Sequence, residues 1–292
     1  MALESLAYLK VIASGCLDFI SGHAPQVISQ WAAVLHMAYP EFQAVSLKEI
    51  VHKLIERTMY NREAHTQSML DFVEFFAGNA ALSKELLRKQ LRGASFDYLY
   101  GSSHDVLTAS GLRLYIEALG SLREKGLSWL ATQCSSYVVL CRATTMRFPS
   151  NDFLGNLSNP RVVEGNSLGL LSALLYFLAW VSLSCPVLEQ PLNSCLPETP
   201  AWKYLLRWTK AICTTTYLGS FGGPSQKPLQ LWHSRMEFVA LSRPRPTWLG
   251  AAAESPVTRD GAKFTGRRDQ LIESEHYTVQ FGRAVADIVC DL

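Results

Sequence analysis

The chain has 292 residues, which is enough to bury one full-size core, either as one large α/β domain or as a domain with an appendage. Its hydrophobic fraction of 48% and charged fraction of 18% are those of a globular protein and exclude wholesale disorder. The formal net charge of +2 gives no strong electrostatic indication of nucleic-acid binding, although basic residues cluster locally at 243–245 and 259–268.

Cysteine usage indicates the compartment. Seven cysteines are scattered without a CxxC pair, and an odd number at wide spacing argues against a disulfide framework or a zinc site. We therefore expect an intracellular, reducing environment and no bound metal, with nucleus, cytoplasm and organelle left open. Glu4 precedes any basic residue, so a secretory signal is not expected. The most apolar run, 168–183, is too short for a confident membrane span and predicts a buried helix.

The first 65 residues differ in character from the rest of the chain and are predicted to form an N-terminal helical extension. Apolar residues recur at helical spacing near the start, and the sequence Ser46-Leu47-Lys48-Glu49 is a capping box that opens an amphipathic helix. These helices are expected either to pack on the sheet or to bind a protein partner, and packing is favoured.

The stretch 68–97 is the most informative part of the sequence. An apolar run of strand length breaks at Ala77-Gly78-Asn79, helical spacing follows, and a second short strand at 94–97 ends on Asp97. In a doubly wound sheet, ligands bind outside the carboxyl ends of adjacent parallel strands. The turn supplies backbone N–H groups, and Asp97 can accept hydrogen bonds from a ribose. The pattern predicts a nucleotide-type pocket, although ordinary strand-to-helix turns also use glycine for steric reasons alone.

Strands and helices alternate through the rest of the chain. Asp105 lies where a third strand would end, helix 109–123 follows, and strand 127–132 delivers Cys134 to the same edge. A polar loop with arginines precedes helix 168–181, and strand 186–191 carries Glu189. Helix 201–213, a hairpin at 215–232, an irregular excursion at 243–268 and a final helix at 280–289 complete the chain.

This alternation predicts the fold class. We expect an α/β domain at residues 66–292, built on a doubly wound, mostly parallel sheet of seven strands, with the helical extension 1–65 in front of it. No internal repeat is visible.

Taken in order, several short motifs resemble those of the DNA cytosine-5 methyltransferases, whose core is a parallel sheet that binds S-adenosylmethionine. Glu74-Phe75-Phe76-Ala77-Gly78 is similar to their first motif, Cys134 matches the nucleophile of their Pro-Cys motif, and Glu189 matches the acid of their Glu-Asn-Val motif. Later segments at 223–227 and 282–285 resemble the Gly-x-Pro-Gln-x-Arg and Gly-Asn-Ala-Val motifs. The resemblance covers about residues 70–290.

The resemblance implies a role for each matching residue. A thiolate at Cys134 would add to carbon 6 of a cytosine ring, and Glu189 would protonate or hydrogen-bond the ring nitrogen. S-adenosylmethionine would be the cofactor. The cofactor-binding residues would be Phe75, Ala77, Gly78, Asn79, Asp97 and Asp105, and the substrate-binding residues would be Arg142, Arg147 and Gln226.

The two catalytic groups would need opposite shifts in pKa. The thiolate at Cys134 requires a lowered pKa, for which Arg142 and Arg147 are candidate causes. The acid at Glu189 requires a raised pKa, which burial beside the apolar residues 186–188 would supply.

The resemblance also implies a shortened member of the family. Only the stretch 233–279 stands where these enzymes insert a sizeable target-recognition domain. The expected function is methyl transfer to a nucleic-acid base, with nucleic acid as the partner. The alternatives are a catalytically inactive descendant that serves as a structural or interaction subunit, with residues 1–65 as its partner surface, and an enzyme that keeps the cofactor but not the cytosine chemistry.

Overall fold

The computed structural model describes residues 2–64, 69–224, 226–247 and 276–292. The strands are β1 (Leu70–Phe75), β2 (Gly93–Phe96), β3 (Leu122–Leu130), β4 (Cys185–Pro191), β5 (Ile212–Tyr217) and β6 (Pro228–His233). The helices are α1 (Ala2–His23), α2 (Pro25–Ala38), α3 (Leu47–Ala64), α4 (Ala81–Arg88), α5 (Ala109–Gly120), α6 (Arg142–Thr145), α7 (Pro160–Val181), α8 (Pro200–Trp208) and α10 (Val279–Asp291). Most of the predicted elements are present, with boundaries shifted by a few residues.

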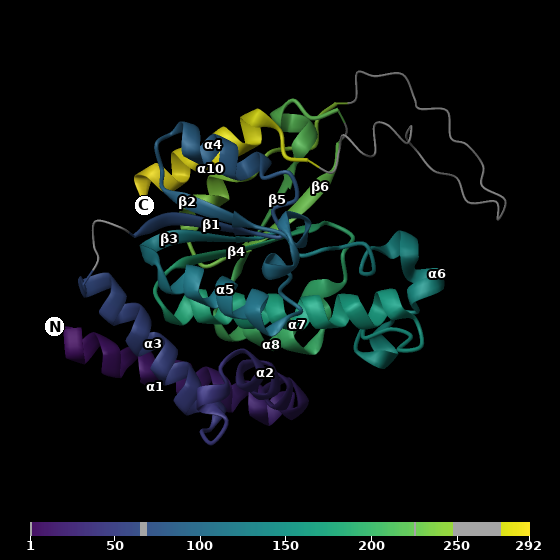
Figure 1. Ribbon diagram of the computed structural model, residues 1–292. Helices are drawn as coiled ribbons and strands as arrows, with labels where there is room; N and C mark the ends of the chain where they lie inside the picture. Colours follow the sequence, from purple (N-terminus) through teal and green to yellow (C-terminus); the bar gives the residue numbers. More distant parts are fainter. Residues whose placement is uncertain (1, 65–68, 225, 248–275) are drawn as a thin grey trace.

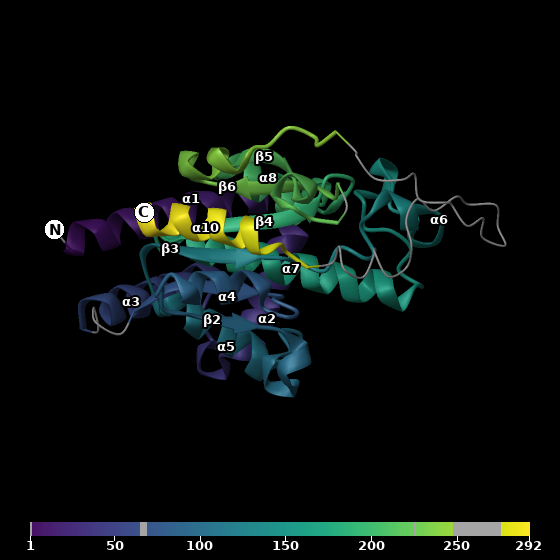
Figure 2. The same ribbon diagram turned by 90° about the horizontal axis from the view of Figure 1, so that it is seen from above.

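The strands form one mixed sheet in the order β2-β1-β3-β4-β6-β5, which Figure 2 shows from β5 at the top to β2 at the bottom. The first four strands in this order are parallel to one another, and β6 runs antiparallel to both β4 and β5. The α/β class and the predicted hairpin are confirmed. The expected seven strands are not found, because the described residues contain six.

The missing strand is the one predicted to end at Asp105. Its place is taken by two short 3₁₀ turns, η3 (Tyr98–Tyr100) and η4 (Ser102–His104). The Asp97 side chain accepts a hydrogen bond from the backbone N–H of Leu99, and the Asp97 carbonyl accepts one from Tyr100. These local bonds use backbone groups that a strand would need for pairing, so the chain turns at once after β2.

Helices cover both faces of the sheet (Figure 1). On one face, α4 and α10 bury apolar side chains against β1, β3 and β4, together with the short turns η8 (Leu218–Phe221) and η9 (Met236–Leu241). On the other face lie α5, α7 and α8. This three-layer arrangement agrees with the doubly wound architecture expected from the alternation of strands and helices.

The N-terminal helices form a further layer, which packs mainly on α5, α7 and α8 (Figure 1). Its contact with the sheet is at the start of β3, where the Arg62 guanidinium of α3 donates to the Leu122 carbonyl at 2.9 Å. The indole N–H of Trp31 donates to the Leu170 carbonyl at 3.1 Å, and the rings of Phe19 and Trp208 lie 5.4 Å apart. Buried residues of α1, α2 and α3 belong to the same apolar cluster as those of the sheet's lower face. The layer therefore packs within the protein as expected, but chiefly on the helices that cover the sheet rather than on the sheet. A protein partner for this layer stays a prediction.

Two helices, Glu4–His23 and Pro160–Val181, are long and apolar enough to cross a membrane by length and composition alone. The most apolar window of α7 is 72% buried within the protein, against 28% for α1. α7 is longer than predicted because Asn159 caps its start and Pro160 occupies its first position. The described part of the chain therefore contains no clear membrane span.

Two helical glycines should respond oppositely to alanine. A Cβ on Gly120, the last residue of α5, would make an ordinary 3.6 Å contact with Thr58 Oγ1, whereas one on Gly165 in α7 would lie 2.2 Å from Ser136 Oγ. We expect Gly120→Ala to raise the free energy of unfolding by about 0.5 kcal/mol and Gly165→Ala to lower it by about 1–3 kcal/mol. Urea unfolding measures both, and equal effects of the two changes would contradict the packing described.

Candidate active site

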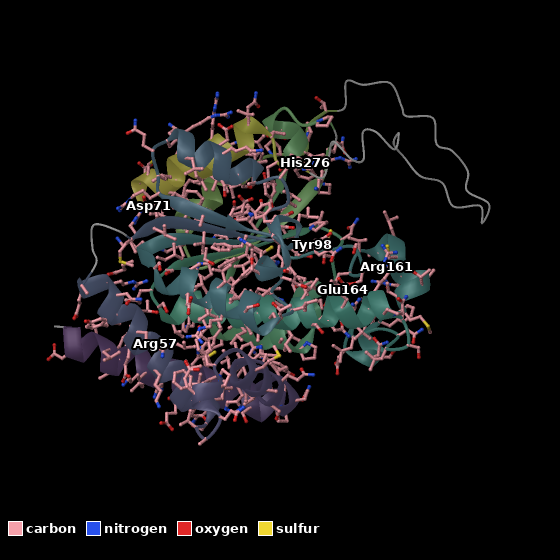
Figure 3. All side chains as sticks on the ribbon, viewed as in Figure 1. Arg57, Asp71, Tyr98, Arg161, Glu164 and His276 are labelled. Atoms are coloured by element: carbon pink, nitrogen blue, oxygen red, sulfur yellow. The ribbon has the colours of Figure 1, made fainter. Side chains whose placement is uncertain are left out.

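The candidate site lies at the topological switch point of the sheet, where the strand order reverses. The chain goes from β1 to β2 on one side and then returns to β3 on the other side of β1, so β1 and β3 flank the switch point of the parallel part. In such sheets ligands bind outside the carboxyl ends of the strands at this point. Phe75 pairs with Leu130, and Leu130 with Leu188, so β1 and β3 end together and β4 continues to Pro191. Figure 3 labels Tyr98 near this edge and Asp71 at the opposite one.

The turn after β1 has an unusual backbone. Phe76, Gly78 and Ala80 all have positive φ, at 59°, 54° and 54°. Phe76 and Ala80 carry a Cβ, which disfavours the left-handed region of φ, so the surrounding structure must hold this strained conformation in place. The Ala77 N–H donates to the Phe96 carbonyl at 3.1 Å, which ties the turn to the end of β2. A Cβ at Gly78 would meet nothing within 4 Å, so one side of the turn is open.

Asp97 lies against this turn, as the sequence predicted. Its Oδ2 accepts the Gly78 N–H at 2.8 Å and its Oδ1 accepts the Leu99 N–H at 2.9 Å, while the Tyr100 hydroxyl donates to the Gly78 carbonyl at 2.8 Å. The Asp97 side chain is 6% exposed. Each carboxylate oxygen has a second lone pair, so both can still accept a hydrogen bond from a ligand.

The other predicted cofactor residues are placed less favourably. The Phe75 side chain is fully buried and stacks on Tyr115 with centroids 4.8 Å apart, and its carbonyl accepts the Ala131 N–H. Phe75 is therefore a core residue, contrary to the expectation that it contacts cofactor. Asn79 is exposed and accepts the Ala81 N–H at 3.1 Å, and Asp105 accepts the Leu107 N–H at 3.0 Å. Neither of these two contacts involves Asp97 or the residues that bind it.

Glu74, which the sequence analysis quoted only as part of a motif, proves to be a buried acid beneath the turn. Its Oε2 accepts the Ser83 backbone N–H at 2.8 Å and the Ser83 hydroxyl at 2.5 Å. Its Oε1 is buried and has no hydrogen-bond partner among the described residues. Burial raises the pKa of Glu74 from 4.5 to about 7, against the opposing effect of the Ser83 hydrogen bonds, and the nearby Asp97 raises it further. An acid that ends a buried strand is the sequence signal that could have identified it.

The raised pKa of Glu74 makes stability depend on pH. Between about pH 4.5 and 7 the folded state holds a proton that the unfolded chain releases, so the stability present below pH 4.5 is lost as pH rises through 7. We expect wild type to lose about 2–3 kcal/mol more than Glu74→Gln between pH 5 and 8, because glutamine cannot ionise. Urea unfolding across this range gives both curves, and parallel curves would show that Glu74 is ionised throughout.

Cys134 and Glu189, the predicted catalytic pair, are close enough to interact electrostatically. Burial raises the pKa of the Cys134 thiol to about 11, and the Glu189 charge raises it further, while Lys227 lowers it. The expectation that Arg142 and Arg147 would lower this pKa is wrong. Both arginines act instead on the buried Cys195. Lys227, from the loop before β6, is the cation that the sequence analysis missed.

Glu189 lies at the carboxyl end of β4 and is 8% exposed. Burial raises its pKa, as the sequence predicted, while Lys227 and a hydrogen bond from Tyr277 oppose the rise. The Tyr277 hydroxyl donates to Glu189 Oε2 at 2.9 Å. Tyr277 precedes α10 in a stretch without periodic pattern, so no signal in the sequence indicated this contact.

Arg147 is a structural residue and not a substrate contact. The residue is 1% exposed, and its guanidinium donates to the carbonyls of Ser136, Phe153 and Val162, to Ser136 Oγ and to Asn166 Oδ1. These five acceptors match its five N–H groups, so none remains for a ligand. The guanidinium joins the segment after β3 to the start of α7.

The remaining predicted substrate residues are engaged elsewhere. The Arg142 guanidinium lies 5.9 Å from the Phe148 ring centroid. Gln226 donates to the Pro246 carbonyl at 3.3 Å and accepts from Arg245 at 2.8 Å. Of the predicted excursion 243–268, the part beyond residue 247 lies outside the described residues, as does the basic cluster at 259–268.

The comparisons with known proteins add no identification: no family model, no curated protein and no solved structure matches the chain. Within the described ranges no group of three or more His, Cys, Asp or Glu residues is placed to hold a metal ion. All seven cysteines are free thiols. Function must therefore be argued from the geometry of this edge.

Proposed function

We propose that the protein is an S-adenosylmethionine-dependent methyltransferase that transfers a methyl group to a nucleic-acid base. The observation that carries this proposal is the contact between Asp97 and the Gly78 turn at the switch point of the sheet. An acid at the end of the second strand, held against a glycine turn at the end of the first, is the arrangement that binds the ribose of a nucleotide-type cofactor. We propose a seven-stranded parallel sheet only as the ancestral form of this fold.

The residues at the turn fit such a cofactor. The open side of Gly78 leaves room for a ligand to approach the backbone, and the Asp97 oxygens each retain a lone pair for ribose hydroxyls. When bound, S-adenosylmethionine supplies an electrophilic methyl group.

The second half of the proposal concerns Cys134 and Glu189. The Cys134 thiolate would attack carbon 6 of a cytosine-type ring, and Glu189 in its neutral form, which burial favours, would donate a hydrogen bond to the ring nitrogen. Lys227 is the group that lowers the pKa of the thiol. A base inside a duplex would have to leave the stack to reach these side chains.

Direct titration with S-adenosylmethionine tests the cofactor site. We expect wild type to bind at micromolar concentration, equivalent to about 8 kcal/mol, and Asp97→Asn to bind at least about tenfold more weakly because a ribose acceptor is lost. Asp287→Asn, which changes an exposed acid on α10, is the matched control and should bind as wild type does. Absence of binding to folded wild type would overturn the cofactor assignment.

A second candidate function is a catalytically inactive methyltransferase-type fold that serves as an interaction subunit. The raised pKa of the Cys134 thiol, about 11, favours it, because at pH 7.5 only about 0.03% of the thiol would be ionised. This candidate keeps the N-terminal helical layer as the surface for a protein partner.

Covalent trapping distinguishes the two candidates. Active enzyme, incubated with cofactor and DNA containing 5-fluorocytosine, should give a complex that survives denaturing electrophoresis. The complex should be absent from Cys134→Ser and present in Cys290→Ser, which changes an exposed thiol. If wild type binds cofactor but forms no complex, cytosine chemistry through Cys134 is wrong and the second candidate, or a different methyl acceptor, replaces it.

A further inference from the structure

A chain of two hydrogen bonds connects three separate elements behind the candidate catalytic acid. The indole N–H of Trp129 on β3 donates to the Tyr277 hydroxyl oxygen at 3.0 Å, and the Tyr277 hydroxyl donates to Glu189 Oε2 on β4 at 2.9 Å. The Trp129 and Tyr277 rings meet edge to face at 5.8 Å and 88°. Figure 3 labels His276, the residue that precedes Tyr277.

The chemistry of the groups fixes the direction of the first hydrogen bond, and the structure has the second running from Tyr277 to Glu189. An indole Nε1 can only donate, so the Tyr277 oxygen must accept from Trp129. A tyrosine hydroxyl has a single proton, which is then directed toward Glu189 Oε2. Oε2 must accept that proton, and it cannot at the same time present a proton of its own along this line.

The two oxygens of Glu189 are therefore unequal. Oε2 is fixed by Tyr277, whereas Oε1 has no hydrogen-bond partner among the described residues. Glu189 is 8% exposed, so its side chain is not entirely closed off from the surface. When Glu189 is neutral, its acidic proton resides on Oε1.

The charged groups around the pair act on both members. Lys227 favours the ionised form of Glu189, and the thiol of Cys134 lies within electrostatic reach of it. On the other side, the charges of Glu189 and Glu74 both raise the pKa of Tyr277, which is also raised strongly by burial. Tyr277 therefore stays protonated and remains a donor at all pH values at which the protein is folded.

We propose that Tyr277 is a positioning residue for Glu189, which confines the acidic proton to Oε1 and turns that oxygen toward the substrate. The use of this proton in methyl transfer rests on the proposed function, but the effect of Tyr277 on Glu189 does not. The same contact anchors the start of α10 to β4, so the acid and the C-terminal helix are held by one hydroxyl group.

The direct test is the titration of Glu189 in the protein without ligand. Carbon-13 NMR of protein labelled at the glutamate carboxyl carbons gives the pKa, and Glu189→Gln assigns the signal. Removing a donor to the ionised carboxylate, as in Tyr277→Phe, should raise the pKa of Glu189 by about 1–2. Tyr98→Phe, which changes an exposed tyrosine, should leave it unchanged. An unchanged or lowered pKa in folded Tyr277→Phe overturns the proposal.

A second variant guards against misfolding of Tyr277→Phe. Trp129→Phe leaves the tyrosine in place but frees its hydroxyl oxygen from the indole, so the tyrosine proton is no longer directed at Oε2 alone. We expect a smaller rise in the pKa of Glu189, in the same direction. A fall would contradict the proposed direction of the hydrogen-bond chain.

Failure of the positioning role and failure of the proposed function give different results. If wild type does not bind S-adenosylmethionine but the Glu189 pKa rises in Tyr277→Phe, the proposed function fails and the positioning role stands. If methyl transfer is observed, Tyr277→Phe should lower kcat, leave KM for the cofactor unchanged and move the alkaline limb of the pH profile upward. If kcat falls but the alkaline limb of the pH profile does not move, Tyr277 acts only through packing and the positioning role is wrong.

Discussion

The parallel pairing of β1 with β3, and of β3 with β4, determines where every candidate residue lies. Because these strands run the same way, the chain must return through α5 and α7 before each new strand, and every strand therefore delivers its following loop to the same edge. Asp97, Cys134 and Glu189 come from segments far apart in the sequence, yet they share this edge. The antiparallel β6 is the exception, and it brings Lys227 to the same place from the opposite direction.

Burial sets the protonation of the site. Glu74, Cys134 and Glu189 all have pKa values raised by desolvation, and among the described residues the cations that oppose the rise are Lys84 at Glu74 and Lys227 at the other two. Burial therefore favours the neutral form of each of these three groups. A cation bound beside them would favour their ionised forms, as Lys227 already does at Cys134 and Glu189.

Sequence periodicity located the strands, and with them Asp97 and Glu189, because a residue at the end of a buried strand has only one edge to occupy. Periodicity could not show which polar side chains already make all their hydrogen bonds within the chain. Arg147 follows the candidate nucleophile and looks like a substrate contact, but all its N–H groups are bound within the chain. Asp97 was expected to face a ligand, yet its side chain also caps the 3₁₀ turn that replaces the strand predicted to end at Asp105. Tyr277 reaches Glu189 across 88 positions of sequence, a distance at which no local pattern carries information.

The packing of the N-terminal layer has a consequence for how the chain is made. Phe19 of α1 stacks against Trp208 at the end of α8, and Gly15 lies against the same indole. During synthesis on the ribosome, the first helices emerge long before α8 exists, so the part of their apolar surface that packs on α8 stays uncovered for most of translation. Because domains are aggregation-prone while such surfaces are exposed, the early helices must either pair among themselves or be shielded by a chaperone until residue 208 has left the tunnel.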